Sequence, residues 1–137
     1  RPGAESRHNL IYWRYGDYVG IGPGAHGRLT LNGQRFATEC IRAPGAWLNA
    51  VAKGSGDCGN VALAPDEFSA EHLMMGMRLV EGIDTVRYAQ LAGHPLPQDK
   101  VHDLLNIGMI AQTGSILRAT VKGRAVLNAV LRELLAD

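Results

Sequence analysis

The segment His8-Asn9-Leu10-Ile11-Tyr12-Trp13 places an imidazole, a carboxamide and two aromatic rings close together in the chain. A neutral imidazole is a good ligand for haem iron, and a neighbouring Tyr or Trp can stack on a porphyrin or hydrogen-bond to it. Taken alone, a histidine beside aromatic residues is more often a packed, hydrogen-bonded side chain at the start of a strand. The segment therefore indicates either an iron ligand at His8 or a packing cluster.

A glycine-rich loop, Gly20-Ile21-Gly22-Pro23-Gly24-Ala25-His26-Gly27, follows closely. Its glycines permit positive φ angles and close approach of the backbone to a neighbour. Residues 22–27 match the pattern GxGxxG, but a dinucleotide-binding loop opens a helix within a βαβ unit, and a hairpin is expected here instead. The loop is thus expected to close over something other than a pyrophosphate.

The remaining polar residues give weaker indications. Cys40 and Cys58 form neither a disulfide framework nor a CxxC metal clamp. Three further histidines, His72, His94 and His102, lack the HExxH spacing of a metal site. Three methionines on one predicted helix, Met74, Met75 and Met77, indicate flexible core packing. Neither a nucleophile elbow nor a Walker loop is present in the sequence.

Composition bounds the class of protein. The chain has 137 residues, 46% hydrophobic and 20% charged, which excludes a disordered chain. No apolar run approaches the roughly 18 residues of a membrane span, and no signal peptide is evident, so we expect a soluble, cytoplasmic protein. A net charge of +1 gives no general attraction for nucleic acid. The chain opens on Arg1-Pro2-Gly3 without an initiator Met, which favours a fragment of a longer protein.

The first 64 residues favour strands and turns. Tyr18–Gly22 is typical of a short strand that opens into the glycine loop. Asn32-Gly33 predicts a hairpin between residues 28–31 and 34–38. After Pro44-Gly45, residues 46–53 predict two helical turns and residues 54–57 predict a flexible break.

From Pro65 onward the pattern is helical. Apolar spacing and glycine or proline stops predict three short helices. The first runs from a cap at Asp66 or Ser69 through the apolar Val80 to Gly82. The second covers Val86–Ala92 and is capped by Asp84, and the third covers Asp99–Ile110. Residues 115–119 predict a small wing, and Thr120 caps a single last helix. This order predicts a winged-helix-like helical domain over 65–137, and α+β as the fold class.

Three stretches together resemble a known family. The ordered set HNxxYW over 8–13, Gly16-Asp17-Tyr18 and the glycine loop closely resembles the oxygen-independent coproporphyrinogen III oxidase family of radical S-adenosylmethionine (SAM) proteins, and its HNxxYW form resembles the haem chaperone (HemW-like) branch. Residues 71–82, 105–110 and 120–130 are similar to the family's later helices and strand entry. The resemblance covers nearly the whole chain.

This resemblance implies a division of the chain at residue 64. Residues 1–64 would be the last strand, glycine loop and hairpin of a truncated radical SAM barrel, and 65–137 the C-terminal winged-helix-like domain. It implies that His8 is the axial haem ligand, supported by Asn9 and Tyr12, and that Gly22, Gly24, Ala25 and His26 contact a cofactor. His26 replaces an aliphatic residue of the oxidase branch, which argues against a second SAM at this loop.

The same resemblance implies a 4Fe–4S cluster and SAM in the full-length protein only. Such a cluster needs at least three clustered cysteines, so this chain alone is expected to be inactive in radical chemistry. The implied partners are haem or porphyrin and the proteins that accept haem. Two alternatives stay open: a porphyrin-biosynthesis oxidase (dehydrogenase) of the same family, and a stand-alone winged-helix module that binds nucleic acid through Arg118, Lys122 and Arg124.

Overall fold

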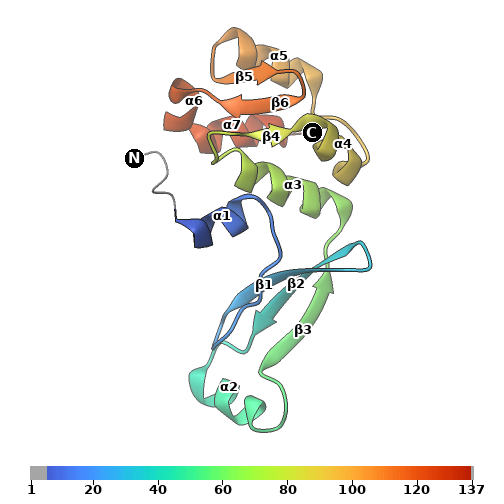
Figure 1. The fold of residues 1–137 in the computed structure, drawn as a ribbon, viewed down its shortest axis with the longest axis vertical. Helices are drawn as coiled ribbons and strands as arrows, with labels where there is room; N and C mark the ends of the chain where they lie inside the picture. Colours follow the sequence, from blue (N-terminus) through green and yellow to red (C-terminus); the bar gives the residue numbers. More distant parts are fainter. Residues whose placement is uncertain (1–5, 137) are drawn as a thin grey trace. The chain divides into compact units, whose positions relative to one another are not determined.

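The computed structural model describes residues 6–136 and divides them into two compact units. One unit is Gly16–Ala64, and the other joins the described residues before Gly16 to those from Pro65 onward. The elements are α1(Arg7–Trp13), β1(His26–Leu31), β2(Gln34–Cys40), α2(Pro44–Val51), β3(Asp57–Ala62), α3(Pro65–Gly76), β4(Ile83–Asp84), α4(Thr85–Ala92), α5(Gln98–Asn106), β5(Ile110–Thr113), β6(Ile116–Ala119), α6(Val121–Ala125) and α7(Leu127–Leu134) (Figure 1).

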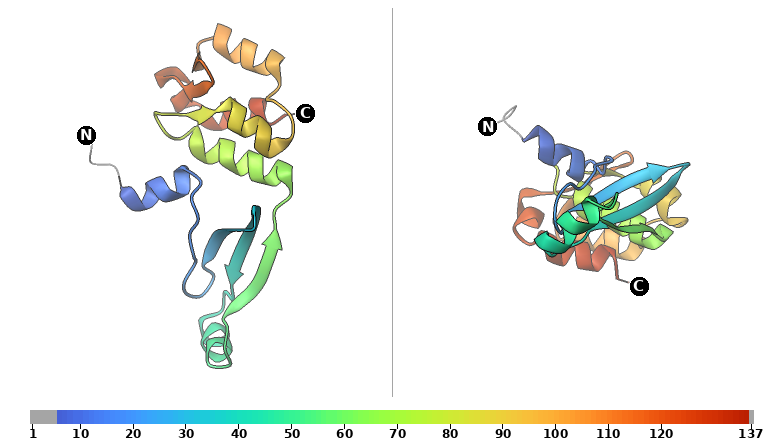
Figure 2. Two further views of the ribbon diagram at one scale, coloured as in Figure 1. Left: turned by 45° about the vertical axis from the view of Figure 1, so that its right-hand side comes forward. Right: turned by 90° about the horizontal axis from the view of Figure 1, so that it is seen from below.

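The unit Gly16–Ala64 is built on an antiparallel sheet in the order β1-β2-β3, with α2 in the connection between the last two strands (Figure 2). The predicted hairpin is confirmed, since Leu31 pairs with Gln34. Asn32 and Gly33 adopt positive φ angles of 51° and 79°, as a two-residue hairpin turn requires. The helical turns expected after Pro44 are also confirmed as α2.

Two expectations for this unit are corrected. The strand expected over Tyr18–Gly22 is reduced to one isolated bridge, Tyr18 with Arg28, because Gly22 takes a φ of 111° that no extended strand can hold. Asp57, expected in a flexible break, instead begins β3, which pairs with β2 through an irregularity between Thr38 and Cys40.

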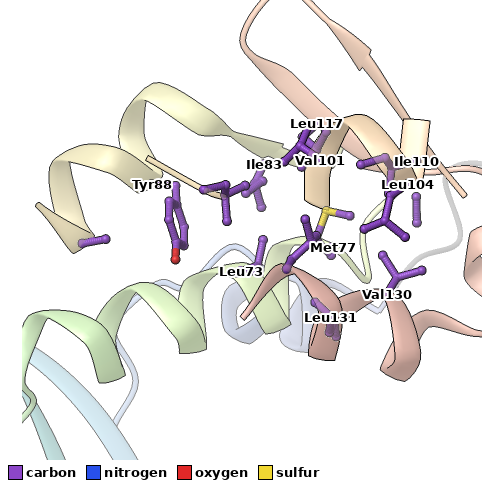
Figure 3. Packing of buried hydrophobic residues seen from close by; sticks show 14 residues of the cluster. Leu73, Met77, Ile83, Tyr88, Val101, Leu104, Ile110, Leu117, Val130 and Leu131 are labelled. Carbon is purple, nitrogen blue, oxygen red and sulfur yellow. The ribbon is translucent and has the colours of Figure 1, made fainter. Parts of the chain in front are cut away.

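The other unit buries an apolar cluster between its helices and the three-stranded sheet β4-β6-β5 (Figure 3). Leu73 from α3, Met77 just after α3 and Leu117 from β6 are fully buried within it. The hairpin β5–β6 is the predicted wing, and Asp84 accepts a hydrogen bond from the Val86 amide, as expected of a cap. The α+β fold class with a winged-helix-like domain is therefore confirmed.

Three helix boundaries differ from expectation. The first helix begins at Pro65 rather than after a cap at Asp66 or Ser69, and it ends at Gly76, so that Val80 is 75% exposed instead of buried. The third helix ends at Asn106, and Ile110, expected at its end, begins β5. The early ends at Gly76 and Asn106 have the same reason: tertiary packing ends each helix where the chain must turn to form or meet the sheet.

The last helix is two helices rather than one. Thr120 caps α6 by accepting a hydrogen bond from the Gly123 amide, as predicted. Val126 then leaves helical geometry, with φ −126° and ψ 31°, and α7 follows. A Cβ at Gly123 would lie 1.8 Å from the Met109 carbonyl oxygen, so α6 packs directly on the strand entry. The break lets α7 turn Val130, Leu131 and Leu134 into the core.

Candidate functional site

His8 and Tyr12 lie on one face of α1, because residues four apart are neighbours on a helix surface. The Tyr12 hydroxyl and His8 Nε2 share a hydrogen bond of 2.6 Å, and the rings meet edge to face at 4.7 Å. Both His8 and Asn9 are exposed. The packing alternative, which puts His8 at the start of a strand, is wrong in its secondary structure: the segment is helical, and α1 has no buried residue of its own.

The residues after Tyr12 attach α1 to α3. Tyr15 is 6% exposed, packs its ring 5.3 Å from that of Phe68 and donates a hydrogen bond of 2.7 Å to Glu71. Arg14 pairs with Glu81 through an N–O distance of 2.8 Å. Tyr15 also adopts a left-handed φ of 58°, an uncommon conformation for a large side chain. These contacts support the helix that presents His8.

His72 on α3 lies next to this attachment, with its ring 5.9 Å from that of Tyr15. The side chain is 8% exposed, and neither ring nitrogen has a hydrogen-bond partner within the described part of the chain. Burial, helped by the charge of Arg87, lowers the pKa of His72 to about 4, and Asp84 acts in the opposite direction. His72 is thus a neutral packing residue, as the sequence indicates.

The glycine loop, in the unit Gly16–Ala64, is a tight backbone crossing. A Cβ at Gly20 would lie 2.5 Å from the His26 carbonyl oxygen, and one at Gly27 would lie 2.4 Å from Thr38 Oγ1. The Gly24 amide donates to Ile41, and the Ala25 amide donates to Gly22. The close contacts therefore explain Gly20 and Gly27 without a ligand, whereas Gly22 and Gly24 have positive φ angles of 111° and 68° and no such close contact. Cofactor binding by Gly22, Gly24, Ala25 and His26 stays a prediction.

Arg35 in the same unit is a buried charge that the sequence did not single out. It is 2% exposed, pairs with Asp17, and donates to Thr30 Oγ1 and the Gly16 carbonyl at 3.0 and 2.9 Å. Burial disfavours the Asp17 carboxylate, but hydrogen bonds from Thr30 and the charge of Arg35 outweigh it and lower the Asp17 pKa. In the sequence, the Gly16-Asp17 turn is the only local feature that points to this hydrogen-bond network.

The three basic residues of the nucleic-acid alternative differ in their contacts and exposure. Lys122 Nζ donates to the Ile107 carbonyl at 3.1 Å, and Arg124 is partly buried with Nη2 enclosed. Arg118 on β6 is exposed. The patch is therefore divided between internal contacts and solvent.

Metal chemistry has little support beyond His8. The described residues contain no cluster of three or more His, Cys, Asp or Glu side chains able to hold a metal ion. Cys40 is buried and Cys58 is exposed, and two thiols do not fit a 4Fe–4S cluster, so we derive no step through one. Burial and the neighbouring Asp57 carboxylate raise the pKa of the Cys40 thiol, which makes it unreactive. Among residues 6–136, no helix has the length and apolar character to cross a bilayer.

Comparisons with known proteins place these features in a family. Residues 63–126 match the HemN C-terminal domain. The chain is 29% identical to the heme chaperone HemW of Escherichia coli over 140 residues, covering 100% of this chain and 36% of that protein. It is 34% identical to the mitochondrial radical S-adenosyl methionine domain-containing protein 1 of Bos taurus over 147 residues, covering 99% of this chain and 33% of that one.

The fold agrees with these relationships. The solved coproporphyrinogen III oxidase (HemN) of Escherichia coli, a radical SAM enzyme, superimposes with a TM-score of 0.61 over 88% of this chain and 29% of that one, at 15% identity. The chain spans about a third of the length of the curated relatives that it matches. It belongs to the HemN/HemW family of radical SAM proteins, and it corresponds to the C-terminal part of that family's members.

Proposed function

We propose that this chain takes part in haem capture through His8, as the C-terminal part of a radical SAM haem chaperone that passes haem to acceptor proteins. The observation that carries the proposal is the exposed His8 imidazole, held by the Tyr12 hydroxyl on an outward face of α1. Relatives named as haem chaperones align with essentially the whole chain, which supports the chaperone function over the oxidase function.

The hydrogen bond with Tyr12 determines which ring nitrogen of His8 is free. If Nε2 carries the proton and donates to the Tyr12 oxygen, the lone pair of Nδ1 is available to iron. Metal-binding histidines usually donate their other N–H to a fixed acceptor, which holds the ring and raises its basicity. Tyr12 therefore fits the supporting role that the motif implies, and Asn9 lies beside His8 on the same exposed turn.

The attachment of α1 makes this ligand usable. Tyr15 and Arg14 contact α3 and Glu81, so α1 is held by tertiary contacts although it is short and buries no residue of its own. Isolated helices of this length are marginal in water. Loss of the Tyr15 and Arg14 contacts would therefore release the helix that positions His8 and Tyr12.

Haem titration of the purified 137-residue chain tests the assignment. His8→Ala should weaken the Soret absorbance change, with an apparent affinity lower by about tenfold or more, since it removes the iron ligand. His102→Ala is the matched control, because His102 is also an exposed histidine on a helix. A His8→Ala titration that superimposes on that of the unaltered chain would show that His8 does not bind the iron.

The other predicted properties belong to the longer protein. We propose that Gly22, Gly24, Ala25 and His26 face a cofactor there, with His26 the exposed side chain of the set. A cytoplasmic location also stays a prediction, since one of the relatives above is named as mitochondrial. The assignment of residues 1–64 to a barrel and 65–137 to a separate domain stays a prediction too. Because α1 contacts α3, a test of this domain boundary must include the residues of α1.

A further inference from the structure

A groove separate from His8 lies where the end of α3 meets α7. Its volume is about 610 Å³, within the usual range for small-molecule sites. Three apolar side chains line it together with two arginines and one amide; the lining residues are Met74, Leu131, Leu135, Arg78, Arg132 and Asn128. An apolar surface with guanidinium groups beside it suits a ligand with an apolar body and acidic ends.

Both arginines keep donors available to a ligand. Arg78 Nη1 donates to the Met74 carbonyl, which uses one of the five N–H groups of its guanidinium. The Arg132 side chain makes no hydrogen bond and no ion pair with any residue of the described range 6–136. Among residues 6–136, no carboxylate lines the groove to neutralise the two positive charges.

Three described acidic residues close in sequence to the two arginines are already engaged. Glu133, adjacent to Arg132, pairs with Lys100 at 3.8 Å. Glu81, close to Arg78, pairs with Arg14, and Glu71 accepts from Tyr15. Within the described part of the chain, the two guanidinium groups thus give the groove a net positive charge that no ion pair compensates.

We infer that this groove binds an apolar dicarboxylate, with one carboxylate at each of Arg78 and Arg132. Arginine is suited to this role because its planar fork matches a carboxylate with two parallel hydrogen bonds. The choice of a tetrapyrrole as the natural ligand rests on the proposed function, whereas the dicarboxylate chemistry rests on the groove alone. This would be a second contact site for the cargo, independent of iron.

Metal-free protoporphyrin IX is the probe, because it carries two carboxylates and has no iron for His8 to bind. Its fluorescence anisotropy should report binding to the chain, and the double variant R78Q/R132Q should weaken that binding by about tenfold or more. R78K/R132K keeps the charge and should recover part of the affinity. Arg118→Gln, an exposed arginine on β6, is the control for general charge loss. Unchanged binding by R78Q/R132Q would overturn the inference.

Two further ligands separate carboxylate recognition from its alternatives. The dimethyl ester of protoporphyrin should bind the unaltered chain as weakly as the free acid binds R78Q/R132Q. An ester that binds as tightly as the acid would show that the groove recognises only apolar surface. Dodecanedioate that competes with protoporphyrin would support the dicarboxylate chemistry and assign the site to open-chain diacids as well. His8→Ala should leave protoporphyrin binding unchanged, so failure at His8 and failure at the groove give different results.

Discussion

The buried His72 should make the stability of this protein depend on pH between about 6.5 and 4. The unfolded chain binds a proton at an ordinary histidine pKa of about 6.5, whereas the folded chain resists it until its pKa of about 4. Below pH 6.5 the unfolded state therefore takes up the proton first, and stability falls as the pH falls. Above pH 6.5 both states are neutral at His72, and this contribution is fully present.

The size of the effect follows from the difference between the two pKa values. Each pH unit is worth about 1.36 kcal/mol, so the full loss below pH 4 is about 3 kcal/mol. About 2 kcal/mol of this should already be lost at pH 5. That is a large share of the roughly 5–15 kcal/mol that stabilises a typical domain.

The groups around His72 set the direction of the shift. Arg87 adds to the effect of burial, and Asp84 opposes it. Glu71 is on the same helix, but its carboxylate accepts the Tyr15 hydroxyl. The carboxylates with lowered pKa values, Asp17, Glu39 and Glu81, also contribute stability that is lost in acid, but only as the pH falls toward and below their ordinary range near 4.

Urea unfolding followed by far-UV circular dichroism at a series of pH values measures this dependence, and a proton NMR titration of the His72 ring reads its pKa directly. His72→Leu is the matched variant, because the ring nitrogens make no hydrogen bond that leucine would lose. It should remove most of the slope between pH 6.5 and 5. A wild-type profile that is flat over that interval, or a slope that His72→Leu retains, would refute the reasoning.

Four further substitutions test other parts of the structure. Gly123→Ala should cost several kcal/mol in urea unfolding, since its Cβ would lie 1.8 Å from the Met109 carbonyl oxygen; an unchanged midpoint would contradict the close approach. Thr120→Ala should cost about 1–2 kcal/mol, because it removes a helix cap. Asp17→Asn should destabilise the sheet unit by removing the carboxylate charge that pairs with the buried Arg35, and hydrogen exchange of β1 and β2 amides should accelerate. Tyr12→Phe should weaken haem binding by about tenfold as His8 loses its acceptor, and tighter binding would mean that Tyr12 competes with iron.

Features encoded within a few neighbouring residues were readable from the sequence. Asn32-Gly33 specified its hairpin, Asp84 and Thr120 specified their caps, and the wing appeared as β5–β6. The motif His8-Asn9-x-x-Tyr12 identified the family, although its residues alone did not show that the segment is helical. Motifs record chemistry that a family retains, and caps and turns depend on local hydrogen bonds, so neither needs knowledge of the rest of the fold.

Tertiary structure alone decided the features that depend on distant partners. Tyr15 meets Glu71 across 56 positions, and this contact attaches the segment that follows α1 to α3. Burial of His72 and Arg35, and the meeting of Arg78 with Arg132 in one groove, likewise require segments far apart in the chain to pack together. The sequence by itself determined which residues can do chemistry, and packing determined which are exposed, which are neutral, and which act together.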